Sequence, residues 1–216
     1  MRTISRALAR AGLLGLFVLL SAPVATAQSL PRPAEFFFDE DAAARPFVAI
    51  EGDDDATVAQ LVRLMDRGGR NADQAIGQLA HLSMAGGRTE TGMALYARAL
   101  ESTSAGSQRR RSLQWNQAWD LYRNGDVEAA LGLWVQAGSN PVVRYDWVPP
   151  TLALALWRLD RRAEAVAWYA AAVRTWPERW SDPASMAAQL PDWSEADRAT
   201  LAEVLAAWAE DPPSWP

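Results

Sequence analysis

The chain has 216 residues, of which 50% are hydrophobic and 22% charged, and its formal net charge is −5. It contains no Cys and a single His, and because all 21 basic residues are Arg it contains no Lys. These absences exclude disulfides, a thiolate nucleophile, a multi-histidine metal site within one chain and catalysis by lysine, and the acidic balance leaves no basic surface for nucleic acid.

The first 27 residues are predicted to be a secretion signal. Several arginines precede an uncharged apolar run at residues 11–20, and Ala25 and Ala27 form the small-x-small pattern of a cleavage site. The run is about half as long as the ~20 residues that a membrane-spanning helix needs. We therefore expect cleavage after Ala27, no membrane insertion of the mature chain, and a periplasmic location in a bacterium.

Residues 28–56 are predicted to be an acidic, irregular lead-in. They contain eight acidic residues but only two Arg, and three prolines interrupt any regular period. Phe36-Phe37-Phe38 is a candidate for docking on the main domain. Asp53-Asp54-Asp55 lacks the alternating oxygen ligands and the distal Glu of a calcium-binding loop, so we interpret it as a solvated linker.

Helical periodicity begins at residue 57. Apolar residues recur every three or four positions in eight segments, and strand-like alternation is nearly missing. Gly or Pro separates most of these segments, and Ser194 with Asp197 three residues later predicts a capped start for the last helix. We expect an all-α domain over residues 57–210, with a terminal helix at 194–210 and a tail at 211–216.

Three stretches of this domain share a pattern of small and aromatic residues, at about 73–104, 111–141 and 146–177. Gly87, Gly125 and Asp160 hold the same place in the three stretches, at spacings of 38 and 35 residues. A period near 34 residues with two helices per unit is typical of a helical solenoid.

The third stretch resembles the tetratricopeptide repeat family at its small, aromatic and closing positions, Ala153, Ala165, Tyr169, Ala172 and Pro177. The second stretch matches with its proline one residue early, and the first departs from the pattern at Gly92 and at Ser104. The resemblance implies a right-handed helix-turn-helix solenoid of about three repeats, in which closely crossing helices require the small residues. Helices at 57–67 and 194–210 are expected to cap its ends.

The resemblance also implies that the first helix of each repeat lines a concave groove that binds another protein or a peptide segment. The residues carried over to this groove are His81, Met84, Trp115, Trp119, Tyr122, Arg123, Trp147, Leu154, Trp157 and Arg158. By spacing alone, Trp115, Trp119 and Tyr122 share one helical face. Trp and Arg are frequent binding hot spots, but a periodic aromatic stripe is more often core packed between repeats, and both interpretations stay open.

Two further features bear on the site. All 11 Trp lie between residues 115 and 215, which places any specific surface in the later repeats and the C-terminal cap. Arg109-Arg110-Arg111 stands at a helix start, where positive charge is unfavourable. Its simplest interpretation is a solvated loop, and the alternatives are contact with an acidic partner or with the chain's own lead-in.

These features lead to two hypotheses for the function. The first is a periplasmic tetratricopeptide-repeat scaffold or adaptor of the bacterial cell envelope, which mediates protein–protein interaction through a concave Trp/Arg-lined groove. The alternative is a module that binds envelope glycan, such as peptidoglycan, with the same aromatic surface. Under either hypothesis we expect no enzyme activity, no cofactor, no metal and no nucleic-acid partner.

Overall fold

The computed structural model describes residues 30–69, 71–140 and 142–214, and in these residues the protein is all-helical, as the periodicity predicts. An isolated parallel β-bridge joins Asp39 to Tyr145. The described residues from Pro31 onward form one compact unit. None of the helices in the described residues is both long and apolar enough to span a membrane. The predicted signal segment, residues 1–27, lies outside the described residues.

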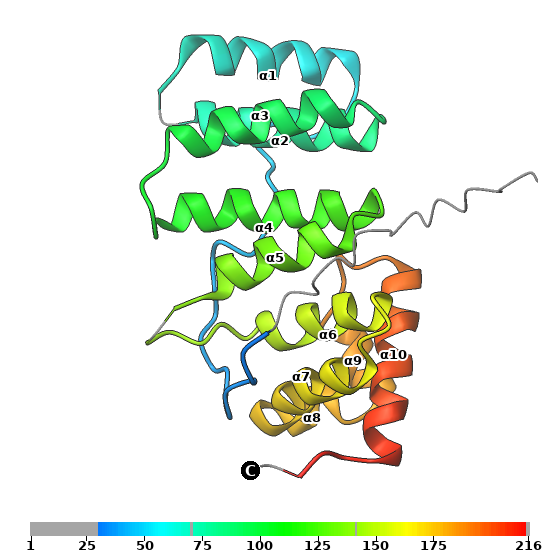
Figure 1. Ribbon diagram of the computed structural model, residues 1–216. Coiled ribbons are helices and arrows are strands. Elements are labelled where there is room, and N and C mark those ends of the chain that lie inside the picture. The colour runs from blue at the N-terminus through cyan, green and yellow to red at the C-terminus, as the bar shows by residue number, and fades with distance from the viewer. Residues whose placement is uncertain (1–29, 70, 141, 215–216) are drawn as a thin grey trace, which may run out of the picture. The chain divides into compact units, whose positions relative to one another are not determined.

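The described part of the chain contains ten helices: α1 (Asp55–Arg67), α2 (Ala72–Ala85), α3 (Thr89–Glu101), α4 (Gln108–Arg123), α5 (Val127–Gly138), α6 (Val148–Arg158), α7 (Arg162–Thr175), α8 (Pro177–Trp180), α9 (Pro183–Ala188) and α10 (Glu195–Glu210). Neighbouring helices pack in pairs, α2 with α3, α4 with α5 and α6 with α7 (Figure 1). These three pairs cover the three stretches of similar sequence. At the two ends, α1 packs on α2, and α10 packs on α6 and α7.

The turn inside each pair has a left-handed residue at the same place. The backbone angle φ is +75° at Gly87, +90° at Gly125 and +59° at Asp160. Glycine adopts this conformation without steric cost, and Asp tolerates it better than most other residues. The three positions that align in the sequence therefore form one repeated turn.

A small residue lets the two helices of the first pair approach closely. A Cβ atom on Gly92 of α3 would lie 2.4 Å from Met84 Cγ and 2.9 Å from the Ala80 carbonyl oxygen, both on α2. Ala130 and Ala165, at the matching positions of the other two pairs, are fully buried. Met84 is thus covered by α3 inside the first pair, which corrects the expectation that it faces a groove.

Part of the lead-in is bound by its backbone to the first helices of two pairs (blue in Figure 1). On α4, the Asn116 side chain accepts from the Phe47 N–H at 3.2 Å and donates to the Arg45 carbonyl at 2.9 Å. On α2, the Gln78 side chain accepts from the Ile50 N–H at 3.1 Å and donates to its carbonyl at 2.7 Å. Because both amides are buried, these bonds satisfy polar groups that are costly to leave unpaired.

The earlier part of the lead-in reaches the third pair. The Phe37 N–H donates to Thr175 Oγ1 at 3.0 Å, and the Phe37 ring lies 5.9 Å from the Trp168 ring between centroids. Arg111 Nη2 lies 3.2 Å from Asp41 Oδ1. The predicted docking of the phenylalanine run is confirmed for Phe37. Of the alternatives for the arginine run, contact with the chain's own lead-in holds for Arg111.

Candidate functional site

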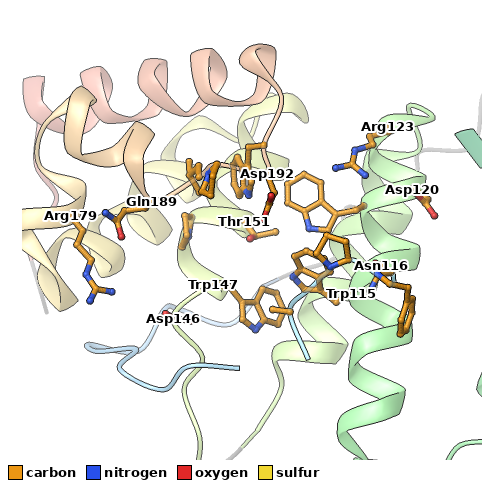
Figure 2. A pocket seen from close by; sticks show the side chains of 18 of the residues that line it. Trp115, Asn116, Asp120, Arg123, Asp146, Trp147, Thr151, Arg179, Gln189 and Asp192 are labelled. Atoms are coloured by element: carbon orange, nitrogen blue, oxygen red, sulfur yellow. Dashed lines mark hydrogen bonds between the residues drawn. The ribbon is translucent and has the colours of Figure 1, made fainter. Parts of the chain in front are cut away.

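A pocket of about 480 Å³ opens between α4 and α6. The lead-in near Pro46 and residues 189–193, which connect α9 to α10, form further walls. Figure 2 shows side chains converging on this pocket from α4 on one side and from α6 and residues 189–193 on the other. Six tryptophans line it: Trp115, Trp119, Trp147, Trp176, Trp180 and Trp193.

The pocket exists because α4 and α6 do not close on each other. α4 packs on α2 and α3 of the first pair. The second pair contacts α6 of the third pair mainly through α5. Trp115 and Trp119 of α4 and Pro150 and Thr151 of α6 all line the space that is left. Large rings at a helix junction keep the helix axes apart, whereas small residues let them approach.

Trp119 joins the pocket wall to the core. Its side chain is 3% exposed, and its ring centroid lies 5.9 Å from that of Trp115, 5.0 Å from that of Trp134 and 5.0 Å from that of Trp193. These edge-to-face contacts hold the ring in a fixed orientation. The sequence left open whether the aromatic stripe of α4 is core or binding surface. Trp119 is both, since it is packed in the core and also forms part of the pocket wall.

A buried carboxylate ties three helices together beside the pocket. Asp120 of α4 is 3% exposed, and its Oδ1 lies 2.7 Å from Nδ1 of His81 on α2. The Tyr96 hydroxyl of α3 donates to Asp120 Oδ2 at 2.6 Å. Burial, followed by the nearby carboxylate, raises the pKa of Tyr96 well above its usual range, so this hydroxyl keeps its proton and remains a donor.

Two guanidinium groups lie at the rim of the pocket. The Arg123 guanidinium is 5.2 Å from the centre of the Trp119 ring, and that of Arg179 is 4.4 Å from the centre of the Trp176 ring. Figure 2 shows these two arginines on opposite sides of the pocket. Cation–π contact of this kind orients a guanidinium while leaving its N–H groups available to a ligand.

Asp146 lies in the wall of the pocket beside Trp147 (Figure 2). Burial raises the pKa of its carboxyl group, and the negative charge of Glu40 raises it further. Within the residues that the structure describes, no group of three or more His, Asp or Glu side chains is placed to hold a metal ion.

Three indole N–H groups of the wall lack a hydrogen-bond partner. The Nε1 atoms of Trp115, Trp119 and Trp176 are buried, and none of them has an acceptor among the described residues. Buried donors in native proteins are nearly always paired, so each unpaired one requires an explanation.

No protein-family model, curated protein or solved structure matches the chain. The pocket is therefore the feature on which a functional proposal has to be based.

Five of the ten groove residues carried over from the resemblance line this pocket. They are His81, Trp115, Trp119, Arg123 and Trp147. Trp147 also donates from Nε1 to Asp41 Oδ2 at 3.4 Å, which links the pocket wall to the lead-in.

The other five lie outside this pocket. Met84, Tyr122 and Leu154 are buried between helices, and Leu154 is 0% exposed. Trp157 donates from Nε1 to Glu203 of α10 at 2.8 Å, because α10 packs against this end of α6. Arg158 is exposed, and its guanidinium lies 5.5 Å from the centre of the Tyr122 ring. At the C-terminal end of α6, Trp157 is therefore held against α10, whereas Arg158 is exposed outside the pocket.

Sequence reasoning missed the walls that come from outside the first helices. Arg179, Trp180 and Trp193 follow the third stretch of similar sequence, Trp176 lies at its end, and Pro46 belongs to the lead-in. The signal that was present is the confinement of all 11 Trp to residues 115–215. It indicates the correct region but not which of these rings meet.

Proposed function

We propose that the protein is a tetratricopeptide-like repeat adaptor of the bacterial envelope, exported to the periplasm, that binds an extended segment of another protein. The binding site is the pocket between α4 and α6. The proposed role is binding rather than catalysis, without a metal or a cofactor.

The observation that carries this proposal is that the first helices already hold an irregular chain segment by its backbone. Asn116 and Gln78 each bind the lead-in through both a backbone donor and a backbone acceptor. Bonds to the backbone do not depend on the side chains of the bound segment, so this face can hold segments of different sequence. The pocket lies beside the lead-in at Pro46, where aromatic walls replace the amide contacts.

The aromatic lining supports a protein segment because Trp and Arg dominate binding energies at protein interfaces. It also favours a second candidate, an envelope glycan, since sugar rings stack on indole faces as well. The two candidates differ in the ligand that binds in the pocket, which is a peptide in the first case and a glycan fragment in the second. One experiment separates them.

The experiment selects 12-residue displayed peptides on the purified protein and titrates the enriched peptides in solution. Binding should weaken at least about tenfold in a Trp115→Ala/Arg123→Ala variant, because these side chains line the pocket. Trp115 is preferred to Trp119 because it is only half-buried, so its loss leaves the core intact. The matched control is Trp157→Ala/Arg158→Ala, outside the pocket, with affinities expected within about threefold of the wild type.

Failure to enrich any peptide that depends on Trp115 and Arg123 would contradict the adaptor proposal. If soluble peptidoglycan fragments then shift the tryptophan emission of the wild type but not of the double variant, the glycan candidate replaces it.

A further inference from the structure

We infer that residues 44–50 of the lead-in, called the strap below, are an intramolecular ligand that a segment of the partner protein displaces from α2 and α4. This inference rests on the proposed function. It concerns how access to the binding face is controlled and which side chains the partner carries.

The strap is held by side chains of two helices and not by regular secondary structure. Asn116 of α4 accepts from the Phe47 N–H at 3.2 Å and donates to the Arg45 carbonyl at 2.9 Å. Gln78 of α2 accepts from two N–H groups of the strap and donates to one of its carbonyls. Because these bonds all reach the backbone of the strap, a different segment that follows the same path can form them too.

Little of the strap is buried. None of residues 44–50, all of which the structure describes, is a buried residue, and the Val48 side chain is 54% exposed. Earlier in the lead-in, by contrast, Phe37 is 7% and Ala43 is 1% exposed. A segment with few buried contacts opens at a lower cost in free energy than the helices it lies on. The strap can therefore leave its place while the earlier lead-in and α1 stay folded.

Two apolar side chains anchor the strap. A Cβ atom on Gly77 of α2 would lie 2.5 Å from Cδ2 and 2.7 Å from Cε2 of Phe47, so the glycine leaves a notch that this ring occupies. Three residues later, Ile50 packs against the apolar cluster that contains Leu61 and Leu79. A segment that replaces the strap therefore carries an aromatic residue for the notch and an aliphatic residue three positions later.

The strap also borders the pocket. Ala44, Pro46 and Phe47 line the pocket from the strap, and Asn116 lines it from α4. Because Asn116 also holds the strap, the pocket and the site under the strap are contiguous. An intramolecular ligand competes at an effective concentration of about 1 mM. Weakly binding segments are therefore excluded, and a partner that carries both anchors gains the second site in addition to the pocket.

The test titrates the full chain with a labelled peptide that has the sequence of residues 43–52, followed by fluorescence anisotropy. Phe47→Ala loosens the strap, so this variant should bind the peptide at least about tenfold more tightly than the wild type. Val48→Ala is the matched control, because this side chain is exposed in the same segment, and it should bind the peptide like the wild type. Replacing either the Phe or the Ile of the peptide with Ala should weaken binding to Phe47→Ala at least about tenfold.

Hydrogen exchange tests the strap in the wild type, without any substitution. The N–H groups of Phe47 and Ile50 should exchange at least about 100-fold faster than those in the middle of α4, because local opening frees them while the helices stay folded. Far-UV circular dichroism and thermal unfolding establish that each variant is folded.

Three results would overturn the inference: equal peptide affinity of the wild type and Phe47→Ala, no peptide binding by Phe47→Ala at millimolar concentration, or equal exchange rates in the strap and in α4. Dimerisation of the wild type that Phe47→Ala abolishes would also overturn it, because the displacing segment would then belong to a second copy of this chain. All of these results leave the adaptor function intact if selected peptides bind through Trp115 and Arg123. Failure to select such peptides contradicts the adaptor function, whatever the strap does.

Discussion

The junction between the first and second helix pairs and the junction between the second and third are built differently. At the first, α4 meets α2 and α3, and Asp120 binds His81 and Tyr96 across it. At the second, α4 and α6 are separated by the pocket, and the packing is made by α5. Both junctions join one helix pair to the next. The α4 residues at each junction therefore determine whether it is closed or accessible to a ligand.

The lead-in reinforces this difference. A Cβ atom on Gly77 of α2 would lie 2.5 Å from Cδ2 of Phe47, so the glycine makes room for this ring beside the first pair. At the second junction the lead-in near Pro46 forms only one wall of the pocket. The same segment therefore fills one site and borders the other.

Breaking the buried network should have the largest effect on the sealed junction. Asp120→Ala leaves the Tyr96 hydroxyl and the His81 ring without their shared acceptor, and we expect a loss of about 3 kcal/mol in the free energy of unfolding. Urea unfolding measures it. Tyr96→Phe, the matched control, removes one donor and keeps the packing, with an expected loss of about 1 kcal/mol. A loss below about 1 kcal/mol for Asp120→Ala would show that the network does not hold the junction together.

Crowding the lead-in should have an intermediate effect. Gly77→Ala pushes against the Phe47 ring at 2.5 Å, and overpacking minus the gain in helix propensity gives an expected net loss of about 1–2 kcal/mol. In a double-mutant cycle with Phe47→Ala, the combined loss should be about 1 kcal/mol smaller than the sum of the single losses. Additive losses would mean that the ring moves aside freely.

The smallest effect is expected at the open junction, where the raised pKa of Asp146 makes stability depend on pH. The folded state holds this proton more tightly than the unfolded state, so protonation of Asp146 stabilises the fold. Its contribution is full below the unfolded pKa near 3.8 and is lost as pH rises through the folded pKa. In Asp146→Asn, the free energy of unfolding measured by chemical denaturation should no longer fall over this pH range. An unchanged pH profile would contradict the raised pKa of Asp146.

The sequence predicts the helices well because their signals are local. Apolar periodicity locates the helix pairs, and the left-handed residues Gly87, Gly125 and Asp160 mark the repeated turns. The capped start at Ser194 is also confirmed, since its Oγ accepts from the Asp197 N–H at 3.1 Å. Each of these features depends on residues within a few positions of one another.

The candidate site is predicted only in part because its walls come from distant segments. Spacing on α4 places Trp115 and Trp119 on one face, but it does not show that Trp193 meets them. Nor does it show that α10 covers Trp157 through Glu203. The path of the lead-in escapes prediction as well, because its bonds to Asn116 and Gln78 use the backbone and leave no pattern in the sequence of residues 45–50.

The bond between the Phe37 N–H and Thr175 spans 138 residues of sequence. A row of helix pairs that touch only their neighbours unfolds piecemeal, with its ends fraying independently. A segment that touches the first, second and third pairs couples them, so melting should be a single cooperative transition. It also delays completion of the fold, because the contact of Phe37 with α7 joins residues far apart in the sequence.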